Sequence, residues 1–411
     1  MQNNFKPLIP VSEALERLLG GVLPVGMENV DLADCNGRIL AENLISKRTQ
    51  PPFAASAMDG YAVRAEDIAA PPATLKVIGE APAGAAFNGQ VGPGETVRIF
   101  TGAPVPDGAD AILIQENTEA GDGVVTALES VASGRYIRKA GLDFAEGQTL
   151  LSAPKRLDFR DISLAAAMNH AQLPVRRKPV VAILATGDEL VLPGEEPGPD
   201  QIVASNGFGI AGLVADCGGT VMDLGLADDD KAVIASHIQP ALSAEADILI
   251  TLGGASVGDH DYMLDVLGDA GMELDFWRIA MRPGKPLLFG RLGKTRVLGL
   301  PGNPVSSLVC GLLFMRPLID ALLGLDPSAD RVSEAILGSD LGENDQRQDY
   351  LRARLETDEQ GRLVATSFSA QDSSMLSVFS QADALIIRPP HAPAAKTGTP
   401  CRIIRLDRSA G

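Results

Sequence analysis

The stretch VVAILAT at residues 180–186 decides the fold, because it is a continuous apolar run that ends in the polar sequence GDEL at 187–190. A strand that is apolar on both faces is typical of a parallel sheet covered by helices on both sides. The same pattern recurs as TVMDLGL at 220–226, DILITLGG at 247–254 and TRVLGL at 295–300. Each of these runs predicts a further strand of the same sheet.

Apolar stretches with helical spacing separate these strands, near residues 208–217, 230–243, 262–270 and 304–323. Strands that alternate with helices along the chain predict a doubly wound α/β domain. The regions on either side, at 46–150 and 327–411, instead contain short β-rich runs between Gly, Pro and Asp turns. The chain is therefore predicted to be a multidomain α/β protein with a central α/β domain and two small β domains.

Composition excludes several classes of protein. A hydrophobic content of 45% in 411 residues excludes bulk disorder, and the net charge of −18 argues against nucleic-acid and anionic-membrane partners. The four cysteines are far apart in the sequence, so neither a disulfide framework nor a zinc site is expected. The N-terminus lacks the pattern of a signal peptide, and no apolar run approaches the roughly 20 residues of a membrane span. A cytoplasmic location is therefore expected.

Polar loops follow three of the predicted strands, at the edge of the sheet where doubly wound domains bind ligands. The first loop, TGDEL at 186–190, has two adjacent acids, which suit a divalent metal, activation of water, or simply a solvated turn. The second loop, GGASVGDHD at 253–261, offers glycine N–H groups to an anion. Its acids fit such a site if a metal bridges them to the anion.

The third loop, LPGNPVSS at 300–307, precedes a helix with Asn303 as expected N-cap and Pro304 as expected first residue. It is either a well-capped helix start or an anion site. The surrounding residues 276–319 contain no acid and seven cations: Arg278, Arg282, Lys285, Arg291, Lys294, Arg296 and Arg316. This local reversal of charge predicts an anion-binding face.

Seven motifs occur in the order found in the molybdopterin molybdenumtransferases, the MoeA and gephyrin E-domain family. They are SAMDGYAVR at 56–64, TGAPVPDGADA at 101–111, IRKAGLD at 137–143, TGDEL at 186–190, GGASVGDHD at 253–261, RPGKP at 282–286 and LPGNPVS at 300–306. Each motif is weak alone, but their shared order is specific. The sequence resembles this family from about residue 10 to residue 405.

The resemblance implies four domains. They are a helical linker and dimerisation domain at 1–45 with 146–177, an inserted β domain at 46–145, a pterin-binding α/β domain at 178–326 and a C-terminal β barrel at 327–411. A helix within 1–26 is able to pack on the α/β domain. The resemblance also implies a homodimer with a shared active cleft, and transient contacts with a molybdopterin adenylyltransferase and with molybdoenzyme apoproteins.

The implied reaction inserts molybdate into adenylylated molybdopterin, which releases AMP and gives molybdenum cofactor, with magnesium as cofactor. The implied catalytic acids are Asp59, Asp143, Glu189, Asp228 and Asp261, and the expected metal ligands among them are Glu189, Asp228 and Asp261. The run of three aspartates at 228–230 leaves the register of Asp228 open.

Substrate-binding residues are expected in the same loops: Thr186, Gly187, Gly253, Gly254, Ser256, Gly258, Pro301, Gly302, Asn303, Pro304 and Ser306. Molybdate is a tetrahedral dianion, so the expected partners are the cations Arg282, Lys285 and Arg352, with a hydroxyl from Ser373 or Ser374. Arg282 stands where the family more often has Lys. The segment QDSSMLS at 371–377 lacks the Gly-rich character of the family.

Two other functions stay open at this point. The resemblance to gephyrin allows a non-catalytic scaffold, although acids are present at every matched position. Residues 254–258 also have the pattern GxSxG of a serine hydrolase, with Ser256 as nucleophile. The histidines after it are His260, four residues on, and His391 in a Pro-rich segment, and neither suits a catalytic triad.

Overall fold

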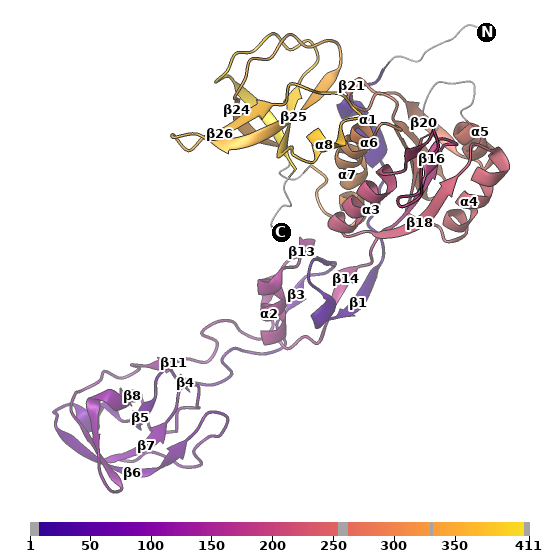
Figure 1. The fold of residues 1–411 in the computed structure, drawn as a ribbon. Helices are drawn as coiled ribbons and strands as arrows, with labels where there is room; N and C mark the ends of the chain where they lie inside the picture. The colour runs from indigo at the N-terminus through magenta and orange to yellow at the C-terminus, as the bar shows by residue number, and fades with distance from the viewer. Residues whose placement is uncertain (1–7, 254–261, 329–331, 407–411) are drawn as a thin grey trace. The chain divides into compact units, whose positions relative to one another are not determined.

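The computed structural model describes residues 8–253, 262–328 and 332–406. The chain divides into two compact units. Unit 1 comprises residues 1–28, 37–41 and 175–411, and unit 2 comprises residues 29–36 and 42–174. Unit 1 contains the α/β domain and the C-terminal β domain, and unit 2 contains the inserted β domain (Figure 1).

A six-stranded sheet with the order β18-β15-β19-β23-β22-β20 forms the centre of the α/β domain. The first four strands are parallel, whereas β22 and β20 run antiparallel to their neighbours. Their bounds are β15 (Val180–Thr186), β18 (Thr220–Ala227), β19 (Ile248–Leu252), β20 (Glu273–Trp277), β22 (Leu288–Leu292) and β23 (Thr295–Leu300). The four parallel strands are those that the apolar runs predict.

Helices cover both faces of this sheet (Figure 1), which confirms the doubly wound class. Side chains along β15 alternate between the two layers: Val181 and Ile183 pack on one, Ala182 and Leu184 on the other. The first layer holds α1 (Val11–Leu19), α3 (Asn206–Cys217), α6 (Pro304–Cys310) and α7 (Arg316–Leu322). The second holds α4 (Lys231–Ser243) and α5 (Tyr262–Asp269).

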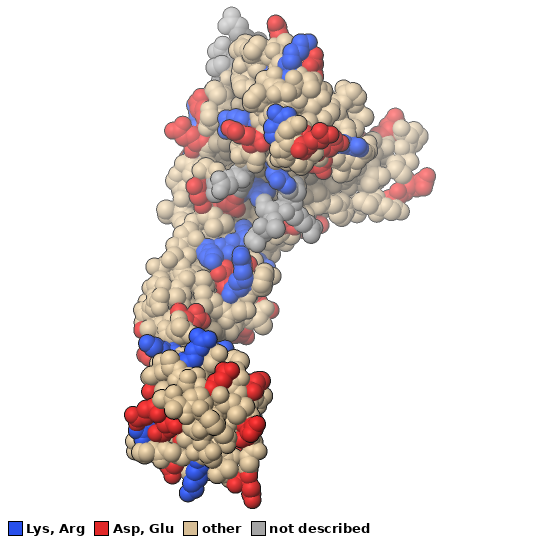
Figure 2. Space-filling view, turned by 90° about the vertical axis from the view of Figure 1, so that its left-hand side faces the viewer, with Lys and Arg blue, Asp and Glu red and all other residues tan. Residues whose placement is uncertain are grey.

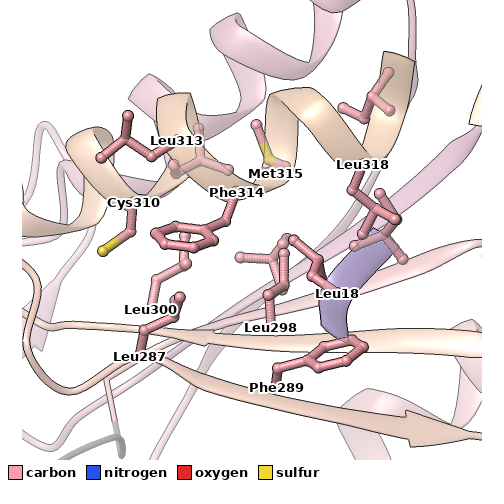
Figure 3. Close-up of a cluster of buried hydrophobic side chains, with 14 of the residues drawn as sticks. Leu18, Leu287, Phe289, Leu298, Leu300, Cys310, Leu313, Phe314, Met315 and Leu318 are labelled. Carbon is pink, nitrogen blue, oxygen red and sulfur yellow. The ribbon is translucent and has the colours of Figure 1, made fainter. Parts of the chain in front are cut away.

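A helical stretch from Pro304 to Leu322 forms the centre of the first layer, with a π turn at Gly311–Met315 between α6 and α7. Pro317 lacks an N–H group and would clash with the carbonyl four residues earlier in a regular α-helix, so the wider turn accommodates it. Figure 3 shows Phe314 pointing from this stretch toward Leu300 of the sheet. Among the described helices, this one alone is long and apolar enough to cross a membrane, and 72% of that window is buried in the core.

The C-terminal β domain closes on itself, because its strands pair in the order β25-β26-β24-β28-β27 and β27 pairs again with β25. The bounds are β24 (Val332–Leu337), β25 (Gln348–Thr357), β26 (Leu363–Ser367), β27 (Ala384–Arg388) and β28 (Pro400–Arg405), with α8 (Leu376–Phe379) between β26 and β27. A short strand of the α/β domain, β21 (Met281–Arg282), joins this barrel beside β25.

The inserted domain of unit 2 is built on a six-stranded sheet with the order β8-β5-β7-β6-β10-β9. The bounds are β5 (Gly60–Val63), β6 (Ala73–Ala81), β7 (Glu95–Ile99), β8 (Ala111–Ile114), β9 (Thr118–Ala120) and β10 (Val124–Ala127). Apolar side chains pack on both faces of this sheet, Val63 and Leu113 in one cluster and Ala62 and Ile112 in the other. A second, two-stranded pairing joins β4 (Ala55–Ser56), which precedes the strands of this sheet in the sequence, to β11 (Ile137–Arg138), which follows them.

The region for which a helical linker is expected contains more strand than helix. Residues 27–45 and 146–177, all of them described, contain one α-helix, α2 (Phe159–Ala167), which begins at a capping box of Asp158 and Asp161. The strands are β1 (Met27–Asp31), β2 (Ile39–Leu40), β3 (Leu44–Ile45), β12 (Thr149–Leu151), β13 (Lys155–Arg156) and β14 (Gln172–Arg176). Most of these strands are too short to give a periodic pattern in the sequence.

Candidate functional site

A cavity of about 500 Å³ lies at the carboxyl ends of the parallel strands. Its walls are the segments that follow β15, β18, β19 and β23, together with the start of α3. From β15 the chain passes to β18 on one side and later to β19 on the other, so the cavity lies at the switch point of the doubly wound sheet. Eight residues predicted from the sequence line it: Thr186, Gly187, Glu189, Gly253, Pro301, Gly302, Asn303 and Pro304.

Gly253, at the end of β19, joins the strand ends on either side of it. Its φ is +97°, and a Cβ atom on it would lie 2.5 Å from the carbonyl oxygen of Thr186. Its N–H donates to the carbonyl of Leu300 at the end of β23, over 3.4 Å. Only a glycine permits this close approach of the three strand ends.

The acidic side of the cavity is formed at the ends of β15 and β18. Glu189 and Asp229 line it, whereas Asp228 is exposed. Burial raises the pKa of Asp229, and the nearby carboxylates of Asp188 and Glu189 raise that pKa further. The N–H of Asp229 donates to Oδ1 of Asp188 over 2.9 Å and holds the two loops together. The structure therefore places Asp229, rather than Asp228, in the cavity.

These carboxylates fit a divalent cation, since a hard cation that binds the Asp229 carboxylate offsets the burial and the neighbouring negative charges that raise its pKa. Glu189 and Asp229 supply two such groups, and Asp261, the third predicted ligand, lies outside the described residues. Within the described ranges, no group of three or more Asp, Glu, His or Cys side chains is assembled as a metal site.

The opposite side of the cavity is the segment 301–304, which hydrogen bonds hold from two directions. Asn206 Nδ2 on α3 donates to the carbonyl of Gly302 over 2.7 Å. Asn303 is the N-cap of α6, as predicted, but its side chain does not cap the helix, because Nδ2 donates instead to Ser373 Oγ over 3.0 Å. The Val305 N–H donates to the Ser373 carbonyl, also over 3.0 Å. The barrel therefore holds this segment as firmly as α3 does.

The other predicted residues of the barrel serve mainly to order the loop around Ser373. Arg352 is only 1% exposed. Its Nε donates to Gln371 Oε1 over 3.0 Å, and its Nη1 donates to the carbonyl of Asp372 over 2.7 Å. The hydroxyl of Ser374 donates to the Asp372 carboxylate over 2.6 Å. Ser306, in contrast, is buried within α6.

The seven cations of the acid-free stretch do not all lack acid partners. Acids from other elements neutralise several of them: Arg282 pairs with Asp345 and Asp349, Arg291 with Asp275, and Lys294 with Glu245. A count along the sequence misses such acids, because they come from outside the acid-free stretch. On the face shown in Figure 2, acidic and basic side chains are likewise interspersed.

Lys285 differs from these cations. It is exposed, and no ion pair or side-chain hydrogen bond joins it to the rest of the described structure. The next residue, Pro286, lines the cavity. Lys285 is therefore an unneutralised cation at the border of the cavity.

The predicted acids Asp59 and Asp143 belong to unit 2. Oδ1 of Asp59 accepts hydrogen bonds from the N–H and the hydroxyl of Thr101, both over 2.7 Å, and these bonds hold the pKa of Asp59 below its usual range. Asp143 is exposed in the loop between β11 and β12. Four further predicted residues lie outside the described part of the chain, and with them the serine-hydrolase motif: Gly254, Ser256, Gly258 and Asp261.

The sequence analysis did not identify three residues that shape the site. Asp229 belongs to a run of three aspartates, in which the sequence does not show which one enters the site. Asn206 belongs to no motif that marks it as a site residue. Ile202, which lines the cavity and is 60% exposed, belongs to the short strand β17 (Ile202–Val203), which pairs with β16 (Leu190–Val191). A two-residue strand gives no pattern to recognise.

Three family models match the chain. They describe the MoeA N-terminal region (domain I and II) at residues 9–169, a probable molybdopterin binding domain at 182–321 and the MoeA C-terminal region (domain IV) at 334–406. The molybdopterin molybdenumtransferase of Haemophilus influenzae is 36% identical over 382 residues, which cover 92% of each chain. That of Bacillus subtilis is 32% identical and is matched over 98% of this chain and 95% of its own.

Solved structures agree with these matches. One structure of the molybdopterin biosynthesis MoeA protein from Pyrococcus horikoshii has a TM-score of 0.85 at 31% identity, with 98% of this chain and 100% of that chain covered. Another structure, titled as a molybdopterin biosynthesis MoeA protein from Pyrococcus horikoshii OT3, has a TM-score of 0.81 at 29% identity and covers 97% of this chain and 100% of that chain. Sequence motifs, fold and relatives agree, and the chain belongs to the molybdopterin molybdenumtransferase (MoeA) family of enzymes.

Proposed function

We propose that this enzyme inserts molybdate into adenylylated molybdopterin, with release of AMP, in the biosynthesis of molybdenum cofactor. The observation that carries the proposal is the cavity at the switch point, where segments after four parallel strands meet in a chain of this family. Carboxylates line one side of this cavity and an unneutralised lysine borders it. A phosphorylated substrate with a metal and an oxyanion needs this combination of groups.

The acidic side would hold magnesium through Glu189 and Asp229, with Asp261 as a third ligand. Bound there, the metal would neutralise charge on the pyrophosphate link of the substrate during its cleavage. Burial and neighbouring acids raise the pKa of Asp229, and a cation that binds its carboxylate compensates for both effects.

Lys285 is proposed to bind the molybdate dianion, with Ser373 as a hydroxyl donor. The ammonium group has no acid partner among the described residues, so its full charge is available to an anion. Ser373 is held at the cavity border by its bond to Asn303, which lines the cavity. The pterin phosphate would be contacted at the carboxyl ends of β15 and β19, by Thr186, Gly187 and Gly253.

The enzyme is further proposed to be a cytoplasmic homodimer with an active cleft shared across the dimer, to which Asp59 and Asp143 contribute. The two bonds from Thr101 keep the Asp59 carboxylate oriented and favour its ionised form. A molybdopterin adenylyltransferase would supply the substrate, and molybdoenzyme apoproteins would receive the product.

Release of AMP from adenylylated molybdopterin tests the reaction, with and without molybdate and magnesium. Asp229→Asn is expected to lower the rate by about 100-fold or more, since it removes a metal-binding carboxylate. Asp228→Asn is the matched control, and its rate should stay within about threefold of the parent because this residue does not line the cavity. Equal losses in the two variants would contradict the register assigned here.

AMP release that needs neither molybdate nor magnesium would contradict the proposed reaction. Complete absence of AMP release would favour a non-catalytic scaffold.

Lys285→Met tests the oxyanion site. The variant is expected to bind molybdate at least about 100-fold more weakly, because it removes the unpaired charge and its three donors. Equilibrium dialysis with molybdenum analysis measures this directly, and normal binding by the variant would show that the site lies elsewhere.

A further inference from the structure

We propose that Arg282 is a positioning residue that acts through Asp349. The two side chains form a latch between the α/β domain and the barrel, here called the 282–349 latch. The latch fixes the loop RPGKP so that Lys285, and not Arg282, meets the oxyanion. This inference rests on the oxyanion-binding role proposed above for Lys285.

The backbone places the two residues of the latch directly opposite one another. β21 and β25 are parallel, with Met281 in register with Gln348 and Arg282 in register with Asp349. The Gln348 N–H donates to the carbonyl of Ala280 over 2.9 Å. Arg282 Nε donates to Asp349 Oδ2 over 3.1 Å, and Nη2 contacts the same oxygen. Opposite charges in register on neighbouring strands stabilise their pairing.

The charges around the latch cancel. The Asp349 side chain is 5% exposed, and Nη1 of Arg282 lies 3.5 Å from a carboxylate oxygen of Asp345. Asp345 in turn pairs with Arg347 over 2.8 Å. Two cations and two anions leave no net positive charge for a dianion, so Arg282 is poorly suited to bind one.

The loop RPGKP (282–286) is also held by its close packing against α6, beyond the latch at Arg282. Gly284 has a φ of +107°, and a Cβ atom on it would lie 2.5 Å from the sulfur of Cys310. The carbonyl of Lys285 accepts a hydrogen bond from the Ile279 N–H over 3.0 Å. The backbone at Lys285 is therefore fixed between the latch and α6, while its side chain is exposed. Release of the latch frees one of these two supports.

Removal of one partner from a buried ion pair leaves an uncompensated charge, whereas removal of both partners is far less harmful. The effect of removing one partner, compared with removing both, therefore distinguishes an Arg282 that positions the loop from an Arg282 that contacts the oxyanion. If Arg282 only holds the loop, Arg282→Gln is harmful mainly because Asp349 is left buried without its partner. A second substitution, Asp349→Asn, then relieves the harm, because it removes the buried charge and leaves two amides, in register on β21 and β25, that hydrogen-bond to each other and hold the loop. If Arg282 touches the oxyanion, the second substitution relieves nothing.

The experiment compares Arg282→Gln, Asp349→Asn and the double variant in the full-length enzyme. Equilibrium dialysis with molybdate and with tungstate gives the Kd of the oxyanion, and the AMP-release assay gives the KM of the adenylylated pterin. Each single variant is expected to raise the molybdate Kd about tenfold and to leave that KM within about twofold. The double variant is expected to return to within about threefold of the parent. Arg291→Gln, which removes another paired arginine of the acid-free stretch, is the matched control and should not change the Kd.

Two outcomes would contradict the positioning role of Arg282. One is a double variant that binds molybdate as weakly as Arg282→Gln alone, and the other is an Arg282→Gln variant with unchanged affinity for molybdate. Where a single variant does not fold, the double variant decides by itself, since binding near the parent value supports the latch and loss of binding contradicts it. Failure of the proposed function has a different signature, because the parent enzyme would then bind no molybdate or Lys285→Met would bind it normally.

Discussion

The two sides of the cavity are stabilised in opposite ways. On the acidic side, burial and the carboxylates of Asp188 and Glu189 raise the pKa of Asp229, and the two loops are joined by the hydrogen bonds from the Asp229 N–H to Asp188 and from the Gly187 N–H to the Ala227 carbonyl. On the opposite side, the segment 301–304 is tied to α3 and to the barrel by three hydrogen bonds. The first side has unfavourable interactions that a ligand must relieve, and the second is ordered before any ligand binds. The difference fits the proposal that a cation organises the acidic side, while the fold itself organises the side opposite.

The largest expected effect comes from the residue that joins the two sides. Gly253→Ala introduces a Cβ atom 2.5 Å from the Thr186 carbonyl at a positive φ. We expect a loss of about 1–3 kcal/mol in unfolding free energy and a fall in kcat/KM of more than about tenfold, because the strand ends must move apart. Gly271→Ala is the matched control, since Gly271 also has a positive φ, +93°, but a Cβ atom there meets nothing within 4 Å and the residue does not line the cavity. Denaturant unfolding measures the loss of stability, and AMP release measures kcat/KM. Equal effects at the two glycines would contradict the role given to the Thr186 contact.

A smaller effect is expected on the ordered side alone. Asn206→Ala removes the bond from Nδ2 to the Gly302 carbonyl and leaves the bond from Asn303 to Ser373 in place. We expect about 1 kcal/mol of lost stability, the net value of one hydrogen bond, and an increase of a fewfold in the KM of the pterin substrate. The affinity for magnesium, measured by titration calorimetry, should not change. A weakened metal site in this variant would show that the two sides are not independent.

The smallest effect concerns pH and the ion pairs of Asp345, a barrel residue beside the 282–349 latch. The side chain of Arg347 lowers the pKa of Asp345 to about 2, from an ordinary value of 3.8. A lowered pKa in the folded state adds stability above pH 3.8, and this stability is lost as the pH falls toward 2. Asp345→Asn should therefore lower the Tm by about 1–2 °C at neutral pH and by nothing at pH 2, since Asp345 is largely exposed to solvent. Glu343→Gln in the same loop is the control, and a pH-independent difference for Asp345→Asn would contradict the assignment.

Much of the α/β domain was predictable because its strands are buried on both faces. Residues 180–185 and 297–300 are apolar throughout, so the sequence marks these strands without help from other segments. Glycine and proline at 253 and at 301–304 marked the loops for a similar local reason, since the backbone there needs those residue types. Short strands such as β2 and β17 were not predictable, because their pairing depends on distant segments.

Side-chain partners across the fold were not predictable either. The acid-free stretch looked like one basic face, and yet Arg282 pairs with an acid 67 residues away on the barrel. The choice between Asp228 and Asp229 depends on which of two adjacent carboxylates points inward after β18, and a polar loop has no periodicity that fixes this.

By itself, the sequence determined the fold class, the family and the loops that build the site, because these follow from local hydrophobicity, turn residues and ordered motifs. Only the tertiary structure decided which acid enters the cavity and which cations of the acid-free stretch find acid partners among the described residues. Charges act through space, and the chain brings acids from the barrel to cations of the α/β domain. The proposed oxyanion site is therefore a property of the folded enzyme more than of the stretch of sequence that first suggested it.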